Sequence, residues 1–255
     1  MEYYYLVVFT IIGMVMGSFY QVIGERLPKG ESLVKPKYSY CPNCKKRLKW
    51  YELIPVFSYI IQLGKCRTCK KEISPMYPFV EIVTGALFAV SYYSFGISYE
   101  LLISLTLVSF FSIVIVSDLT YMIIPDEVTL ITALIIIVVN FLNLGIKDGF
   151  IQLGYGLITF GFMYLIMLFG NFLFKKESLG GADVKLMVLS GLVLHPVLAV
   201  LVIFIASCIA LPISLVILLT DKEHMIPFGP FLVAAMIFLY FLKIDLNTFV
   251  QLFTF

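Results

Sequence analysis

The sequence predicts an all-α, polytopic membrane protein with about eight transmembrane helices and one water-exposed, cysteine-rich loop. Hydrophobic residues make up 61% of its 255 residues and charged residues only 13%, whereas a soluble domain has about 25% charged residues. Uncharged apolar runs of about 20 residues, the length that crosses a bilayer, recur along the chain. These observations exclude a soluble globular fold.

Eight apolar runs are expected to form the spans, and the sixth of them is too short to cross a bilayer alone. Pro196 removes an amide donor and disfavours helix at the residue before it, so a break is expected at His195-Pro196. One span across this position would be about 36 residues long, which is far too long. The runs are Tyr4 to Ile23, Pro78 to Phe95, Leu101 to Ser117, Val128 to Gly145, Phe150 to Phe174, Val184 to Leu194, Val197 to Leu219 and Ile226 to Leu242.

Charge and hydropathy divide the chain into a first transmembrane helix (residues 1–23), a cysteine-rich loop (24–77) and a transmembrane catalytic bundle (78–255). The loop holds twelve Lys and Arg residues and four Glu residues, so its formal charge is +8. Short loops rich in Lys and Arg face the cytoplasm. The eight-span topology puts sixteen of the eighteen basic residues on that side, with Lys147, Lys243 and both termini on the other.

Two Cys-x-x-Cys pairs in the loop predict a structural zinc site. Cys41 and Cys44 precede Cys66 and Cys69 with 21 residues between the pairs, a spacing close to that of four-cysteine zinc sites. Two disulfides or four free thiols are the alternatives, and a cytoplasmic location disfavours disulfides. Because a loop of about 50 residues builds only a small core, the metal would supply much of its folding free energy.

Two aspartates at the cytoplasmic ends of spans form the candidate catalytic pair. Asp118 follows the third run, and Asp183 follows Gly180, Gly181 and Ala182 at the start of the sixth. Acidic groups beside spans are costly and suggest function, although each alone could be an ordinary helix-end acid. Two adjacent carboxylates share one proton, so the ionised one can activate water while the neutral one polarises a peptide carbonyl. The small residues would let an extended substrate approach Asp183.

Together, these features resemble the type IV prepilin peptidases, which are bifunctional leader peptidases and N-methyltransferases of the GxGD aspartyl protease group. The resemblance covers nearly the whole chain, and its motifs match in order, spacing and sidedness. Ala182 stands at the second glycine of GxGD, and Gln21 stands where the family commonly has asparagine. The motifs are Gly17-Ser18-Phe19 to Arg26-Leu27-Pro28, the cysteine pairs, Ile73 to Glu81, Asp118 with Ile124-Pro125-Asp126, Gly180 to Leu186, and Ile226 to Pro230.

The resemblance implies an aspartic endopeptidase of the bacterial inner membrane that cuts the short basic leader from prepilins or pseudopilins on the cytoplasmic side. Asp118 and Asp183 would be its catalytic dyad. The family typically methylates the new amino terminus with S-adenosylmethionine. The position of Glu81 in the sequence implies that it takes part in binding this cofactor. Structural Zn²⁺ and S-adenosylmethionine are thus the expected cofactors, prepilins and membrane lipids are the expected partners, and no nucleic-acid partner is expected.

Alternatives remain open at this stage. A prepilin peptidase could lack the methyltransferase activity, since no nucleotide-type glycine loop marks a cofactor site. An ion-coupled transporter could use the acids to carry protons or cations, but transport sites favour the bilayer midplane, whereas these acids lie at span ends on one side. A non-enzymatic scaffold would leave the acid pair and the glycine run unexplained.

Overall fold

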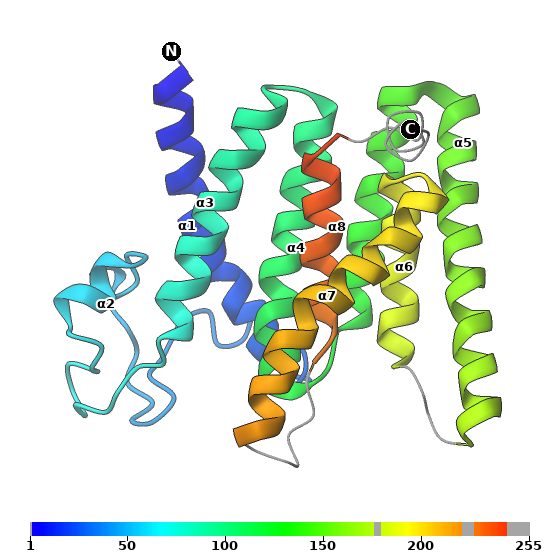
Figure 1. Ribbon diagram of the computed structural model, residues 1–255. Helices are drawn as coiled ribbons and strands as arrows, with labels where there is room; N and C mark the ends of the chain where they lie inside the picture. Colours follow the sequence, from blue (N-terminus) through cyan, green and yellow to red (C-terminus); the bar gives the residue numbers. More distant parts are fainter. Residues whose placement is uncertain (1, 176–179, 221–226, 244–255) are drawn as a thin grey trace.

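The computed structural model describes residues 2–175, 180–220 and 227–243. These residues form helices and short turns, with two isolated β-bridges and no longer strand. The long helices stand side by side as a bundle, and the predicted cysteine-rich loop (24–77, the cysteine module) lies at one end and to one side of it (Figure 1). The all-α architecture and the clustered cysteines confirm the predicted fold class.

Within the described residues, five helices are long and apolar enough to cross a membrane, namely α1, α3, α4, α5 and α7. Two shorter helices, α6 and α8, have 13 residues each and complete the bundle. The elements are α1 (Glu2–Arg26), the 3-10 helix η1 (Trp50–Glu52), α2 (Phe57–Ile61), α3 (Met76–Phe95), α4 (Tyr99–Tyr121), α5 (Asp126–Phe174), α6 (Gly181–Val193), α7 (Pro196–Thr220) and α8 (Gly229–Phe241).

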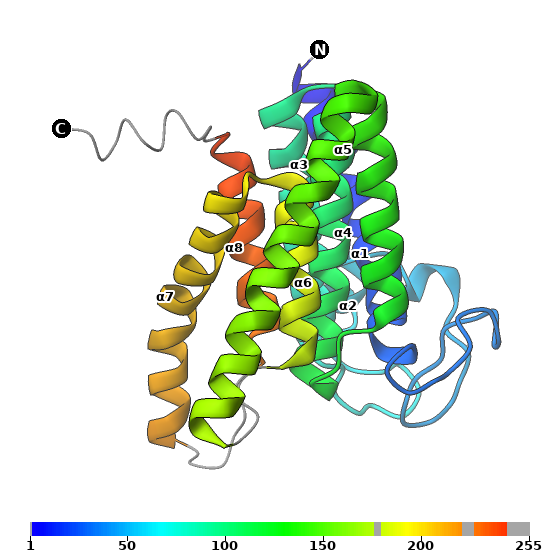
Figure 2. The ribbon, with the colours of Figure 1, turned by 90° about the vertical axis from the view of Figure 1, so that its right-hand side faces the viewer.

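The 49 residues of α5 contain one break, at Gly145, where φ is 82° and ψ is 178°. Glycine adopts this backbone readily because it has no side chain. Figures 1 and 2 show that the chain reverses at this end of the bundle, away from the cysteine module. The two limbs of α5 correspond to the fourth and fifth predicted spans.

The predicted break between the sixth and seventh runs is confirmed, because α6 ends at Val193 and α7 begins at Pro196. Other helix ends differ from the predicted limits. Helix α1 continues past residue 23 to Arg26, and α3 begins before residue 78, at Met76. The predicted start of the last span, Ile226, lies outside the described residues. The division into three domains stays a prediction.

Small residues let α1 approach α3 and α4 closely. A β-carbon added to Gly13 would lie 2.8 Å from the Cα of Gly85 on α3. One added to Gly24 would lie 2.8 Å from the Cβ of Val116 on α4. Close backbone approach is how helices in membranes gain packing contacts. These contacts bring the last turns of α1 against the helices that carry Glu81 and Asp118.

Polar side chains of α5 fix the position of α6. The Asn140 amide donates a hydrogen bond of 2.7 Å to the carbonyl of Leu192, and the Thr159 hydroxyl donates one of 2.8 Å to the carbonyl of Met187. Both side chains are at most 5% exposed. Since these buried groups would cost free energy if left unpaired, the two bonds hold α6, which carries Asp183 in its first turn, in one register.

Replacing Gly191 with alanine is expected to lower the free energy of unfolding by about 1–3 kcal/mol, as overpacking does. Its β-carbon would lie 2.5 Å from the carbonyl oxygen of Tyr155 and 2.8 Å from the Cα of Gly156, and backbone atoms cannot move aside easily. The measurement is unfolding of the detergent-solubilised protein, followed by circular dichroism. Gly161→Ala is the control, because no atom of the described part of the chain lies within 4 Å of the position that its β-carbon would take. An equal loss of stability in both variants would contradict the packing argument.

Candidate active site

Asp118 lies in the last turn of α4, and 6% of its surface is exposed. The first residue of α8, Gly229, approaches it so closely that a β-carbon there would lie 2.7 Å from Asp118 Oδ2. The backbone N–H of Gly229 donates a hydrogen bond to the same carboxylate. The close approach explains why glycine, and no larger residue, begins α8.

Asp183 lies half-buried in the first turn of α6, and its N–H donates a hydrogen bond of 3.1 Å to the carbonyl of Gly180. The charge of Asp118 acts on the carboxyl group of Asp183. Helix α8 packs against both α4 and α6, and the ends that carry the two acids point toward the end of the bundle near the cysteine module (Figure 1). The structure therefore brings together two acids that are far apart in the sequence.

Gly180 and Gly181, before Asp183, have no side chains to crowd the helix start. Both are exposed, and no atom of the described residues lies within 4 Å of the position that a β-carbon on Gly181 would take. Ala182 is helical and does not have a positive φ. Alanine therefore fits without backbone strain where GxGD has its second glycine.

The four cysteines come together in one cluster. Their sulfur atoms all lie within 4.8 Å of one another, and the sulfur atoms of Cys41 and Cys69 are 3.9 Å apart. Sulfur ligands at about 2.3 Å from a tetrahedral zinc ion would be about 3.8 Å apart. All four cysteines are free thiols, so the geometry favours one metal site over two disulfides.

The two cysteine pairs have the same local backbone. In each pair, the N–H of the first cysteine donates to the carbonyl of the residue five positions later, at 3.0 Å in the first pair and 2.9 Å in the second. Lys45 and Lys70 occupy the same place in the two turns and take left-handed φ values of 56° and 58°. This repeated turn lets each pair present two sulfur atoms to a shared ion.

The surroundings of the cluster favour the metal-binding form of Cys69, whereas loss of water contact and the neighbouring cysteines raise the pKa of Cys44 to about 11. A hydrogen bond from the side chain of Asn43 lowers the pKa of Cys69 to about 6, and the thiolate is the form that binds metals. The fifth cysteine, Cys208, lies exposed on α7 and is not part of the cluster. The residues present fit a structural zinc ion with the ligands Cys41, Cys44, Cys66 and Cys69.

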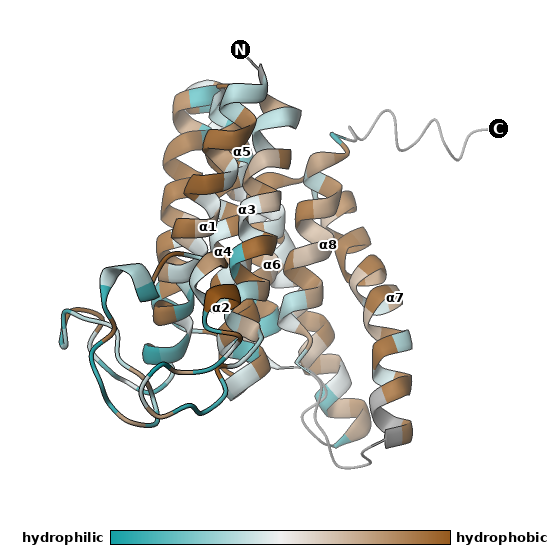
Figure 3. Cartoon of the chain, turned by 90° about the vertical axis from the view of Figure 1, so that its left-hand side faces the viewer, coloured by the Kyte–Doolittle hydropathy of each residue, from teal (hydrophilic) through white to brown (hydrophobic). Residues whose placement is uncertain are grey.

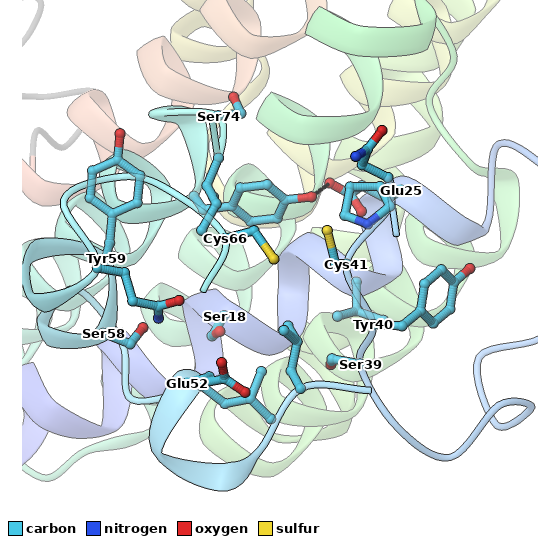
Figure 4. Close-up of a pocket in the computed structure, with 18 of the residues that line it drawn as sticks. Ser18, Glu25, Ser39, Tyr40, Cys41, Glu52, Ser58, Tyr59, Cys66 and Ser74 are labelled. Atoms are coloured by element: carbon cyan, nitrogen blue, oxygen red, sulfur yellow. Dashed lines mark hydrogen bonds between the residues drawn. The ribbon is translucent and has the colours of Figure 1, made fainter. Parts of the chain in front are cut away.

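A cavity of about 490 Å³ lies between the cysteine module and the adjoining ends of α1 and α3 (Figure 4). Cavities of this size bind small molecules. Ser18 and Glu25 of α1, Glu52 of η1 and Tyr77 of α3 are among the residues that line it. The hydroxyl of Tyr77 donates a hydrogen bond to Glu25 across the space between α3 and α1.

Glu81 also lines this cavity, and only 7% of its surface is exposed. Its Oε2 accepts a hydrogen bond of 2.7 Å from the N–H of Val56, and the hydroxyl of Ser18 donates to the same carboxylate. Val56 has a φ of 61°, which is rare for a β-branched residue. Glu81 therefore holds a strained turn of the cysteine module against the bundle, a contact that its sequence position did not indicate.

The cavity gathers the acidic residues of an otherwise basic segment. All four acids of the cysteine module line it together with Glu81, whereas only four of the twelve basic residues do. A segment with a formal charge of +8 thus presents equal numbers of acids and bases to the cavity, and Glu81 of α3 brings the lining to five acids and four bases, which favours a ligand that carries positive charge. The five acids are Glu25, Glu31, Glu52, Glu72 and Glu81.

Tyr121 connects the cavity with the acid pair. It is the last residue of α4, three positions after Asp118. Lys29, which lines the cavity, lies over the Tyr121 ring at 5.2 Å from its centroid. A hydrogen bond with Tyr121 raises the pKa of Lys29. The acid pair and the cavity are therefore neighbouring sites.

Comparisons with known proteins decide the family. The model of the bacterial peptidase A24 N-terminal domain matches residues 11–95, and that of the type IV leader peptidase family matches residues 105–215. A prepilin leader peptidase/N-methyltransferase of Bacillus subtilis is 33% identical over 241 residues, which cover 92% of this chain and 93% of the relative. The chain belongs to the type IV leader peptidase family.

Other relatives in this family carry the same name. The Myxococcus xanthus protein is 35% identical, and the match covers 71% of this chain and 53% of the relative. The Neisseria gonorrhoeae protein is 26% identical, and the match covers 87% of this chain and 85% of the relative. No solved structure gives a significant match. The predicted resemblance is confirmed, and the family and the long apolar helices together indicate a multi-pass inner-membrane protein.

Several contacts at the two sites were not predicted from the sequence. The approach of Gly229 to Asp118 and the hydrogen bond between Tyr77 and Glu25 join segments that no local pattern connects. Gln21, which replaces the family's asparagine, is 2% exposed and donates a hydrogen bond of 3.0 Å to the carbonyl of Tyr77.

Proposed function

We propose that the protein cleaves the short basic leader of prepilins or pseudopilins at Asp118 and Asp183, and methylates the new amino terminus with S-adenosylmethionine. The approach of these two acids, in a chain of the type IV leader peptidase family, carries the proposal. The relatives named prepilin leader peptidase/N-methyltransferase support both activities. The family offers no support for an ion-coupled transporter.

The acid pair can hydrolyse a peptide bond without a covalent intermediate. Two carboxylates close together hold one proton between them. The ionised carboxylate takes a proton from a water molecule as its oxygen attacks the scissile carbonyl, and the protonated carboxyl donates to the carbonyl oxygen. The hydrogen bond from Gly229 orients the Asp118 carboxylate, and the exposed glycines Gly180 and Gly181 would let an extended peptide approach Asp183.

We place the active site on the cytoplasmic side of the membrane. The basic residues of the cysteine module gather at the end of the bundle that carries the acids. Lys147 follows the break in α5 and Lys243 follows α8, and both of these element ends lie away from the module (Figure 1). Lys176 and Lys222, counted on the cytoplasmic side, lie outside the described residues. The distribution supports the orientation because cytoplasmic loops are enriched in Lys and Arg.

The cavity beside the cysteine module is the proposed site of S-adenosylmethionine. When bound, this cofactor supplies a methyl group from a positively charged sulfur, so it suits a cavity of about 490 Å³ lined by five acids and four bases. Glu25, Glu52 and Glu81 would hold its cationic groups. A carboxylate there can also accept the proton that the new amino terminus must lose before it is methylated.

Purified protein incubated with a prepilin substrate is expected to release the leader, and S-adenosylmethionine is expected to increase the mass of the mature product by that of one CH₂, because a methyl group replaces a hydrogen. Mass spectrometry measures both. Glu81→Gln should retain cleavage but lower S-adenosylmethionine binding about 10- to 150-fold, because a hydrogen bond to a charged group contributes about 1.5–3 kcal/mol. Equilibrium dialysis with radiolabelled cofactor measures the binding.

Glu127→Gln is the matched control for this experiment, since Glu127 is an exposed acid at the start of α5 and does not line the cavity. Unchanged binding in the Glu81 variant would contradict the assignment of this residue to the cofactor. Leader removal without any methylation by the wild type would restrict the function to the peptidase.

A further inference from the structure

The cysteine module carries an exposed apolar patch on its outer surface. Trp50, Phe57, Ile60, Ile61 and Leu63 are each between 60% and 83% exposed. Figure 3 shows the brown of apolar residues on α2, against the teal of polar residues along much of the surrounding module. An apolar patch of this kind marks an interaction surface, because water-exposed surfaces rarely carry one.

Helix α2 exposes its apolar face and turns its polar face inward, which is the reverse of a helix on the surface of a soluble protein. Phe57, Ile60 and Ile61 have the spacing of one helix face, and all three side chains are exposed. Ser58 and Tyr59, on the other face, line the cavity instead. A helix with an apolar outer face and a polar inner face is suited to an apolar environment outside and a polar one inside.

Basic residues border the apolar patch on both sides. Between Lys49 and Lys65 the only charged residue in the sequence is Glu52, and that residue is 7% exposed. Both lysines are exposed, and Trp50 follows Lys49 directly. Aromatic and apolar residues flanked by lysine are typical of segments in a membrane–water interface. The lysines would face anionic lipid headgroups.

A hydrogen bond fixes the level of α2 along the bundle. Val56, directly before α2, donates to Glu81, which lies five residues inside α3. At a rise of 1.5 Å per residue, this level is about 7.5 Å from the start of α3. At this level of α3, on either side of Glu81 in the sequence, Phe79 is 54% exposed and Ile82 is 49% exposed. Helix α2 therefore stands beside the apolar part of a candidate membrane span and not beyond its end (Figure 1).

We propose that α2 and the apolar patch insert into the membrane interface, and that the flanking lysines bind anionic headgroups. The module is then anchored in the membrane interface, whereas its charge alone predicted a water-exposed loop. Since α2 also forms a wall of the cavity, the anchor holds the cavity at the level of the lipid headgroups. If the proposed function is correct, a membrane-embedded substrate would present its new amino terminus at that level.

The single tryptophan of the chain, Trp50, allows a direct test on the unlabelled wild type. The full-length protein is placed in vesicles of phosphatidylcholine and phosphatidylglycerol, with or without acyl-brominated phosphatidylcholine. Brominated lipid is expected to remove about half or more of the fluorescence, since interfacial segments reach about 5–10 Å into the boundary between headgroups and acyl chains. Aqueous iodide is expected to quench little.

Strong iodide quenching with no effect of brominated lipid would overturn the proposal. Trp50 could instead be protected from iodide only at a high protein-to-lipid ratio, again without quenching by bromine. This result would identify a second copy of the chain on the patch and would also overturn the proposal. Cleavage of a prepilin is measured in the same vesicles. Bromine quenching without cleavage would reject the proposed function and leave the membrane anchor standing.

Two variants sharpen the test. Ile60→Glu places a charge in the patch and is expected to abolish most of the bromine quenching and restore quenching by iodide. Val34→Glu is the matched control, because Val34 is a 63% exposed apolar residue of the same module outside the patch. Equal effects of the two substitutions would contradict an anchor centred on α2. If Ile60→Glu prevents folding, the wild-type measurement still decides.

Discussion

Replacing either Asp118 or Asp183 with asparagine is expected to lower prepilin cleavage about 10²- to 10⁴-fold, the usual contribution of general acid–base catalysis. Asparagine has nearly the size of aspartate but can neither hold the shared proton nor accept one from water. The remaining carboxylate would have no partner for the second proton transfer. The measurement is the rate of leader removal from a prepilin by the purified protein, followed by mass spectrometry.

Asp126→Asn is the matched control for this pair. Asp126 is an acid at the start of α5 whose side chain is 70% exposed, and it forms an ion pair of 2.7 Å with Lys185. An exposed ion pair contributes about 0–1 kcal/mol, so this variant should cleave at the wild-type rate. Equal thermal midpoints for the three variants would exclude unfolding as the cause. Wild-type cleavage by the Asp118 or Asp183 variant would refute the proposed dyad.

Replacing Cys41 with serine is expected to remove most of the bound zinc and to unfold much of the cysteine module. Cys41 is 7% exposed and belongs to the four-sulfur cluster. Structural zinc sites contribute about 10–16 kcal/mol of binding free energy in small metal-dependent folds, and the module has little apolar core to compensate. Elemental analysis gives the zinc content, and limited proteolysis shows whether the segment between α1 and α3 has become cleavable.

Cys208→Ser is the control, because Cys208 is the one cysteine outside the cluster. This variant should keep one zinc ion per chain and the protease resistance of the wild type. Full zinc content in the Cys41 variant would show that the cluster is not the metal site. Loss of zinc without new proteolytic sites would instead show that the module folds on its contacts with α1 and α3.

Most of the fold was predictable because membrane helices are determined by local composition. Runs without charge must form helices in a bilayer, since every backbone group has to be paired within the segment. Pro196 breaks the chain between α6 and α7 as its chemistry requires. The kink of α5 at Gly145 also coincides with the end of a predicted span. Exact helix ends were less predictable, because they depend on contacts with neighbouring segments.

The candidate sites were predictable to different degrees. The clustering of the four candidate metal ligands follows from their spacing, because two short turns can each present two sulfur atoms to one ion. The acid pair was inferred from two acids at the same membrane side, and the structure places Asp183 within range of the Asp118 charge. The cavity was not predicted, because Glu25, Glu52 and Glu81 come from three segments that meet only when the module folds against the bundle.

The sequence by itself determined the membrane class, the family and the residue types available for chemistry, since these depend on composition and on the spacing of motifs. Tertiary structure decided which groups meet. Packing of α8 places Gly229 on Asp118, and the hydrogen bond from Val56 to Glu81 sets the level of α2 beside the bundle. Such contacts join residues distant in the chain, and their geometry depends on how close helix surfaces approach, which no local pattern of residues specifies.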